Sequence, residues 1–215
     1  MNQPATPVRP ACQRCRRPLM ACWCQRLPTL DTATRVVFLQ HPREARVAVG
    51  TARMAHLCLP NSSLHVGTRW DEDPAVILEL SNLDSQPILL FPGPNAPDIL
   101  KEPPAGPVTL VVIDGTWSQA GKLVKRSPVL SALPRYGFVP PAASAYRIRK
   151  EPRADCVSTI EALAYVLGVL EKNPTGMLTL LDPFHDMVEF QVDHAQRLHQ
   201  PRRRIKNRKA AQPSS

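Results

Sequence analysis

Four cysteines near the N-terminus have the spacing of a metal site. Cys12, Cys15, Cys22 and Cys24 form the pattern C-x2-C-x6-C-x-C. Two thiolate pairs can close a tetrahedral shell around one ion, and Zn²⁺ tolerates the tight C-x-C pair because its filled d shell imposes no angular preference. We expect a structural zinc site, with an iron–sulfur cluster or a redox pair as alternatives. Since protein ligands would fill all four positions, no catalytic metal is expected here.

A carboxylate at the end of an apolar segment is the second candidate. Residues 108–113 read Val-Thr-Leu-Val-Val-Ile, and Asp114, Gly115, Thr116 and Trp117 follow them. An aspartate at the end of a strand can act as a base or orient a ligand amine. The alternative is an aspartate that caps the next helix, with Trp117 in the core. Neither GxGxxG nor GxxxxGK[ST] occurs in the sequence, so a cofactor with a pyrophosphate is not expected.

The positive charge of the chain lies at its two ends. The sequence has 27 Lys and Arg against 18 Asp and Glu, a formal net charge of +9. Residues 1–27 contribute +5 and residues 200–215 contribute +6, which leaves −2 for residues 28–199. Such ends favour contacts with nucleic-acid phosphates, a solvated tail being the alternative for the C-terminal run. We expect a basic segment with the zinc site at 1–27, a catalytic domain at 28–199 and a disordered basic tail at 200–215.

Alternating strands and helices are expected to position these groups. Apolar runs predict strands at 35–40, 64–67, 86–91, 108–113 and 136–139. Apolar periodicity and capping signals, such as the box Ser158-Thr-Ile-Glu161, predict helices at 44–59, 74–80, 118–126 and 159–171. A last helix is expected to follow Asp182 as its N-cap, with Pro183 in its first position, and to extend to about His199. The first helix is expected to bury Val47, Met54, Ala55 and Cys58. This order is typical of an α/β fold with a mostly parallel sheet, whose ligand sites gather at the carboxyl ends of strands.

Five blocks of the sequence, in the same order, resemble the DTW-domain family of tRNA-uridine aminocarboxypropyltransferases. Asp114-Gly-Thr-Trp117 resembles the D-x-T-W signature, and the cysteine pattern resembles the family's N-terminal set. The remaining blocks are His41-Pro-Arg-Glu44 with Gly50-Thr-Ala-Arg53, and Tyr146–Pro152 followed by Ser158–Ala162. The resemblance covers roughly residues 12–190 and departs at Gly50, where asparagine is expected.

This resemblance implies a fold and a reaction. The fold is similar to the SPOUT class of RNA-modifying enzymes, with a C-terminal knot that holds S-adenosylmethionine. The reaction moves the 3-amino-3-carboxypropyl group of S-adenosylmethionine to N3 of a tRNA uridine and releases methylthioadenosine. In bacterial members the uridine is at position 47, in the variable loop.

The resemblance also implies roles for residues. Asp114 is the expected base for the uracil imide proton, and the alternative is that it only orients the cofactor amine or the uracil. Eight residues are expected to line the cofactor pocket, by their position in the blocks: Thr51, Phe91, Thr116, Trp117, Phe138, Cys156, Ser158 and Thr159.

A basic run between Tyr146 and Ser158 is the expected tRNA contact. Its members are Arg147, Arg149, Lys150 and Arg153. Guanidinium groups bind phosphates and carboxylates, so a grip on the cofactor carboxylate and a solvated loop are the alternatives. On the last helix we expect solvent-facing or otherwise satisfied side chains, rather than metal ligands, at His185, His194 and His199.

Two other functions stay open. A SPOUT-like RNA methyltransferase would use the same cofactor and leave S-adenosylhomocysteine, and a zinc-ribbon RNA-binding protein would have no catalytic role. No apolar run approaches the ~20 residues that span a bilayer, and the N-terminus lacks a secretory apolar region. We therefore expect a cytoplasmic protein with no membrane contact, and a monomer or weak homodimer from the resemblance.

Overall fold

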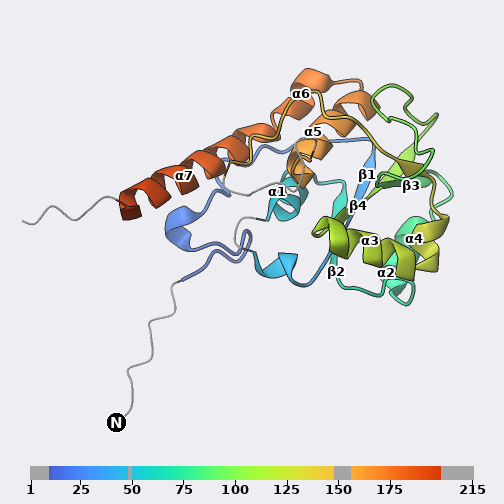
Figure 1. Ribbon diagram of the computed structural model, residues 1–215, viewed down its shortest axis with the longest axis horizontal. Coiled ribbons are helices and arrows are strands. Elements are labelled where there is room, and N and C mark those ends of the chain that lie inside the picture. The colour runs from blue at the N-terminus through green and yellow to red at the C-terminus, as the bar shows by residue number, and fades with distance from the viewer. Residues whose placement is uncertain (1–9, 48–49, 148–155, 200–215) are drawn as a thin grey trace, which may run out of the picture.

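A five-stranded parallel sheet forms the centre of the computed structural model (Figure 1), which describes residues 10–47, 50–147 and 156–199. The strands lie in the order β2-β1-β4-β3-β5, and every neighbouring pair is parallel. Their bounds are β1 (Arg35–Gln40), β2 (Ser62–Val66), β3 (Gln86–Leu90), β4 (Val108–Asp114) and β5 (Arg135–Tyr136). The expected α/β class with a parallel sheet is confirmed.

Helices cover both faces of this sheet (Figure 1). Successive strand residues point to opposite faces, so Val36 and Phe38 belong to one core cluster and Val37 and Leu39 to the other. The first face packs against α1 (Thr51–Cys58), α5 (Thr159–Leu170), α6 (Pro174–Leu178) and α7 (Leu181–His199). The second packs against α2 (Pro74–Leu80), α3 (Trp117–Arg126) and α4 (Pro128–Ala132). Because both faces are covered, the middle residues of β1 and β4 are apolar, Val36–Leu39 and Leu110–Ile113.

The chain order reverses between β1 and β4. After β1 the chain continues to β2 on one side, whereas the chain after β4 passes through α3 and α4 to β5 on the other side of β3. In open parallel sheets a crevice forms at such a point, at the carboxyl ends of the strands. Gln40 and Asp114 are register partners at the ends of these two strands. The topology therefore places Asp114 where a ligand site is expected.

The first predicted helix is interrupted. A single 3-10 turn, η2 (Glu44–Arg46), is followed by extended backbone at Val47, and α1 begins only after Gly50. Met54 and Cys58 are buried as predicted, but Val47 is 43% exposed. The prediction for Val47 is wrong because the extended backbone breaks the helical register that would have aligned it with Met54.

Prolines and turns account for most other differences. Two short helices were not predicted, α4 and α6; each starts with a proline after a capping side chain, Ser127 or Asn173. The predicted strand 136–139 shortens to Arg135–Tyr136, and Val139 is exposed. The last helix begins at Leu181, so Asp182 lies in its first turn and is not its N-cap. β2 begins at Ser62, two residues earlier than expected.

Two other expectations concern topology and membranes. The described residues do not test the predicted knot, which stays a prediction. Within the described ranges, none of the helices combines the length and apolar character needed to cross a membrane.

Glu79 on α2 joins this helix to the edge of the sheet. Its carboxylate accepts hydrogen bonds from Ser63 Oγ at 2.7 Å, His65 Nε2 at 2.9 Å and Arg35 Nη2 at 3.0 Å. Burial alone would raise the pKa of Glu79, but the hydrogen bonds from Ser63, His65 and Arg35 and the Arg35 charge outweigh burial and lower it. The carboxylate form is therefore the one that stabilises the fold.

Glu79→Gln is expected to lower the free energy of unfolding by about 1–3 kcal/mol at pH 7. Because the folded pKa of Glu79 lies below the ordinary glutamate value of 4.5, this contribution is present above pH 4.5 and is lost as the pH falls through the folded pKa. Urea unfolding between pH 7 and 3 should show that the free energies of unfolding of the wild type and of Glu79→Gln become equal as the pH falls. Glu72→Gln is the control, because Glu72 is exposed and its ion pair with Arg69 is long, at 3.9 Å. A constant difference at all pH values would contradict this account.

Candidate functional site

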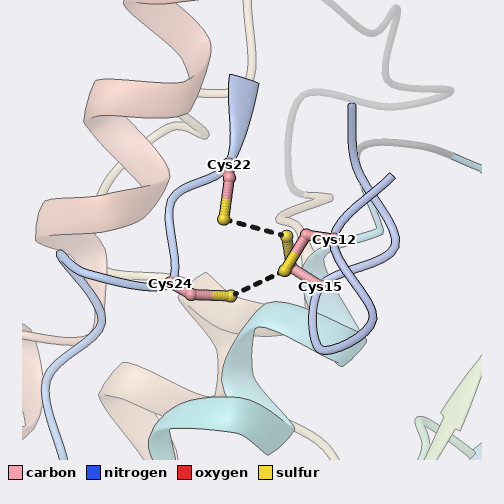
Figure 2. Close-up of side chains that lie close together, drawn as sticks. All are labelled: Cys12, Cys15, Cys22 and Cys24. Atoms are coloured by element: carbon pink, nitrogen blue, oxygen red, sulfur yellow. Dashed lines mark hydrogen bonds between the residues drawn. The ribbon is translucent and has the colours of Figure 1, made fainter. Parts of the chain in front are cut away.

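The four predicted cysteine ligands lie together, with their side chains directed toward one another (Figure 2). Their sulfur atoms are all within 4.8 Å of one another. The pairs Cys12–Cys24 and Cys15–Cys22 are each 3.7 Å apart, and all four cysteines are free thiols. A tetrahedral zinc with Zn–S bonds of about 2.3 Å places its sulfurs about 3.8 Å apart. The cluster is therefore compatible with one zinc ion.

The surroundings of the cluster shift the pKa values of its thiols in opposite directions. Backbone N–H groups of Cys15 and Arg14 lower the pKa of Cys12 to about 6, whereas burial raises the pKa of Cys24 to about 12. The Arg17 side chain is only 4% exposed, and its guanidinium carbon lies 4.2 Å above the Trp23 ring. Burial lowers the pKa of Arg17, and the charges of Cys15 and other neighbours oppose that shift. A buried cation next to the cluster offsets the negative charge that four thiolates and Zn²⁺ would carry.

A cleft of 760 Å³ opens at the carboxyl ends of β3 and β4. Its walls also include the first residues of α1, α3 and α5 and the segment after β5. The structure brings Asp114 into this cleft together with all eight residues expected to contact a cofactor, which are Thr51, Phe91, Thr116, Trp117, Phe138, Cys156, Ser158 and Thr159. Their roles in binding stay predictions.

Asp114 is held in one orientation within the cleft. Its side chain accepts a hydrogen bond from Gln40 Nε2 at 2.8 Å on one oxygen and from Thr159 Oγ1 at 3.1 Å on the other. Its backbone carbonyl accepts from His41 N at 2.8 Å. The residue is 8% exposed. The sequence predicts no role for Gln40, although a glutamine at the end of a buried strand indicates a polar contact there.

The residues after Asp114 show which side chain caps α3. Thr116 Oγ1 accepts from the backbone N–H of Gln119 at 3.3 Å, and Gln119 Oε1 accepts from the Thr116 N–H at 2.7 Å. Trp117 is 48% exposed, and its ring lies 6.0 Å from that of Phe91. The alternative in which Asp114 caps the helix and Trp117 fills the core is therefore wrong. Both aromatic rings are instead available to a ligand in the cleft.

Arg53 on α1 interacts electrostatically with this carboxylate. Burial lowers the pKa of Arg53, the charge of Arg16 lowers it further, and Asp114 opposes the shift. Its Nη2 atom is buried and has no hydrogen-bond partner in the described part of the chain. Arg53 lies in one of the blocks that resemble the family, but the sequence predicts no role for it.

One further residue lines the cleft, although the sequence predicts no ligand role for it. Tyr146 lines the cleft, is 5% exposed and packs edge-on against Phe184 at 5.4 Å. Beyond it, Arg147 is exposed. The other members of the basic run, Arg149, Lys150 and Arg153, lie outside the described residues, so the tRNA contact stays a prediction.

Two of the three histidines on α7 lie against aromatic rings. His185 is 5.6 Å from Phe184, and His194 stacks on Phe190 at 6.2 Å. Both histidines are exposed, whereas the side chain of His199 lies outside the described residues.

Comparison with known proteins gives one family and several relatives. The model of the DTW domain matches residues 9–192. The chain is 36% identical to tRNA-uridine aminocarboxypropyltransferase 2 of Drosophila melanogaster, over 88% of this chain and 78% of the fly protein. It is 34% identical to the Mus musculus protein of the same name, over 86% of this chain and 65% of the mouse protein. It is 29% identical to tRNA-uridine aminocarboxypropyltransferase A of Arabidopsis thaliana, over 88% and 84%. No solved structure matches the chain significantly.

Proposed function

Because this chain belongs to the DTW-domain family, we propose that it is a tRNA-uridine aminocarboxypropyltransferase. Its relatives in fly, mouse and plant carry that name. The observation that carries the proposal is the position of the family signature, since Asp114, Thr116 and Trp117 all line one cleft at the carboxyl ends of the strands. A non-catalytic RNA-binding protein would need no such cleft.

The proposed donor is S-adenosylmethionine. The cleft volume of 760 Å³ lies within the range of about 300–1,000 Å³ that is usual for ligands of this size. Phe91 and Trp117 offer faces for an adenine ring, and a donor without a pyrophosphate needs no glycine-rich cradle. When bound, its sulfonium supplies a carbon already activated for transfer. The chain's own contribution is therefore to position the donor and the uridine and to exclude water.

The proposed acceptor is N3 of a uridine, which must lose a proton before it can form a bond. We propose that the Asp114 carboxylate accepts that proton. A carboxylate is a weak base, but it can accept the proton while the new bond forms. Gln40 and Thr159 restrict its rotation, so its oxygens keep one direction toward the cleft. The alternative role for Asp114 is to orient the donor amine or the uracil ring.

The remaining parts of the proposal concern tRNA and the cell. Arg147 and its basic neighbours Arg149, Lys150 and Arg153 would contact tRNA phosphates, with the basic ends of the chain adding salt-dependent affinity. The target would be the variable-loop uridine. We further propose a SPOUT-like knot, a structural zinc ion in an N-terminal module at 1–27, a catalytic domain at 28–199 with a basic tail, a monomer or weak homodimer, and a cytoplasmic location.

The nucleoside product distinguishes this reaction from methyl transfer. Purified protein incubated with S-adenosylmethionine and an unmodified tRNA transcript is expected to release methylthioadenosine and to form aminocarboxypropyl-uridine, both measured by mass spectrometry. A transcript in which cytidine replaces the variable-loop uridine is the control and should remain unmodified. S-adenosylhomocysteine with a methylated nucleoside would instead establish the methyltransferase. If neither product forms, the proposal that this chain is an enzyme is refuted.

A further inference from the structure

We propose that Glu161 is a positioning residue of this cleft. Without contacting a ligand itself, it holds two walls of the cleft in place, together with Thr159, which donates a hydrogen bond to Asp114. The proposal rests on the proposed function for its link to the donor. Its structural basis is a set of hydrogen bonds to both ends of the segment that joins Tyr146 to Ser158.

Four hydrogen bonds converge on the Glu161 carboxylate. One oxygen accepts from Ser158 N at 2.7 Å, from Ser158 Oγ at 2.6 Å and from Ser144 Oγ at 2.8 Å. The other oxygen accepts from Ala145 N at 2.7 Å. Glu161 is 3% exposed and forms no ion pair with any Lys or Arg in the described part of the chain. A buried carboxylate without a counter-ion depends on its hydrogen-bond donors, so each of these contacts matters.

Helix capping explains only half of this arrangement. A capping box needs the N3 glutamate to accept from the N-cap backbone, which is the contact with Ser158. The bonds to Ser144 and Ala145 cross 17 and 16 residues of sequence and contribute nothing to the helix end. Their effect is to tie the loop after β5 to the start of α5.

Both tied ends carry residues of the cleft. Tyr146 directly follows Ala145, its backbone N–H donates to Ser144 Oγ at 3.1 Å, and its ring lines the cleft. At the other end, Ser158 and Thr159 line the cleft, and Thr159 donates to Asp114 at 3.1 Å. The geometry therefore connects one buried carboxylate to two walls of the cleft and to the orientation of Asp114.

Glu161→Gln tests this connection with little change in size. An amide nitrogen in place of either oxygen would face a backbone N–H, that of Ser158 or that of Ala145, which cannot accept a hydrogen bond. Titration calorimetry is expected to show at least about tenfold weaker binding of S-adenosylmethionine. Hydrogen exchange should become faster in peptides that cover residues 144–146 and 156–159.

Glu171→Gln is the matched control. Glu171 lies at the other end of α5 and accepts from the backbone N–H groups of Ala33 at 2.8 Å and Thr34 at 2.9 Å, but it does not line the cleft. The same substitution there should lower the unfolding temperature and speed exchange at residues 33–34, with the donor dissociation constant within about twofold of wild type. A loss of donor binding that is equal in the two variants would reduce Glu161 to a general structural role and overturn the proposal.

A milder variant covers the case in which Glu161→Gln does not fold. Ser144→Ala removes one of the four hydrogen bonds to Glu161 and also the acceptor of the Tyr146 N–H. It is expected to weaken S-adenosylmethionine binding about threefold, with faster exchange at both tied ends, and faster exchange at residues 156–159 reports the loss at Glu161. Unchanged binding and unchanged exchange in Ser144→Ala would overturn the proposal. A wild-type protein that does not bind S-adenosylmethionine would refute the proposed function instead, and hydrogen exchange alone would then decide whether Glu161 ties the two ends.

Discussion

Asp114→Asn is expected to lower kcat/KM for tRNA modification by about 10²–10⁴-fold, because general-base catalysis contributes rate factors of that size. The fold should tolerate the change. The asparagine oxygen can still accept from Gln40 Nε2, and its NH2 group can donate to Thr159 Oγ1, which as a hydroxyl also accepts. The substitution therefore removes the proton acceptor and preserves the two hydrogen bonds.

The value of kcat and the dissociation constants of tRNA and S-adenosylmethionine together distinguish a base at Asp114 from a residue that only orients a ligand. If Asp114 takes the proton, kcat falls while the dissociation constants of tRNA and S-adenosylmethionine stay within about twofold. If it only orients the donor amine, donor binding weakens together with the rate. Asp84→Asn is the control, because Asp84 is exposed and lies outside the cleft. Normal turnover by Asp114→Asn would exclude both roles.

Cys15→Ser is expected to release the metal and to destabilise the whole protein. Structural zinc binds with about 10–16 kcal/mol in small zinc domains at pH 7. Cys15 is 3% exposed and belongs, with Trp23, to the same core cluster as Tyr146 and Phe184. Loss of even 4 kcal/mol would lower the unfolding temperature of a chain of this length by roughly 8–16 °C. Elemental analysis should find about one zinc per wild-type chain and almost none in the variant.

Cys58→Ala is the matched control for the metal. Cys58 is fully buried in the same core but is not part of the four-cysteine cluster. Its loss should cost about 1 kcal/mol of stability and leave the zinc content unchanged. Metal-free wild-type protein that stays folded and active would contradict the structural role. If the protein instead shows the visible absorption that is typical of an iron–sulfur cluster, the cysteines hold that cluster and not zinc.

Much of the site could be predicted because it depends on short stretches of chain. The apolar run 108–113 had to form a buried strand, so Asp114 had to lie at the carboxyl edge of the sheet. The cysteine spacing identified the four members of the cluster, since all of them lie within thirteen residues. The box from Ser158 to Glu161 determined where α5 starts. In each case the partners are neighbours in sequence, and their residue types are sufficient to identify the interaction.

The parts that escaped prediction depend on residues far apart in the chain. Trp117 lines a cleft beside Phe91, a residue that directly follows β3 and lies 26 positions earlier in the chain. Gln40 acquired its role only because β1 and β4 pair in a register that sets it opposite Asp114. The sequence by itself determined the strand, the carboxylate at its end and the cysteine cluster. Only the tertiary structure decided how that carboxylate is held and that Glu161 ties together two walls of the cleft, because these hydrogen bonds join residues that only folding brings together.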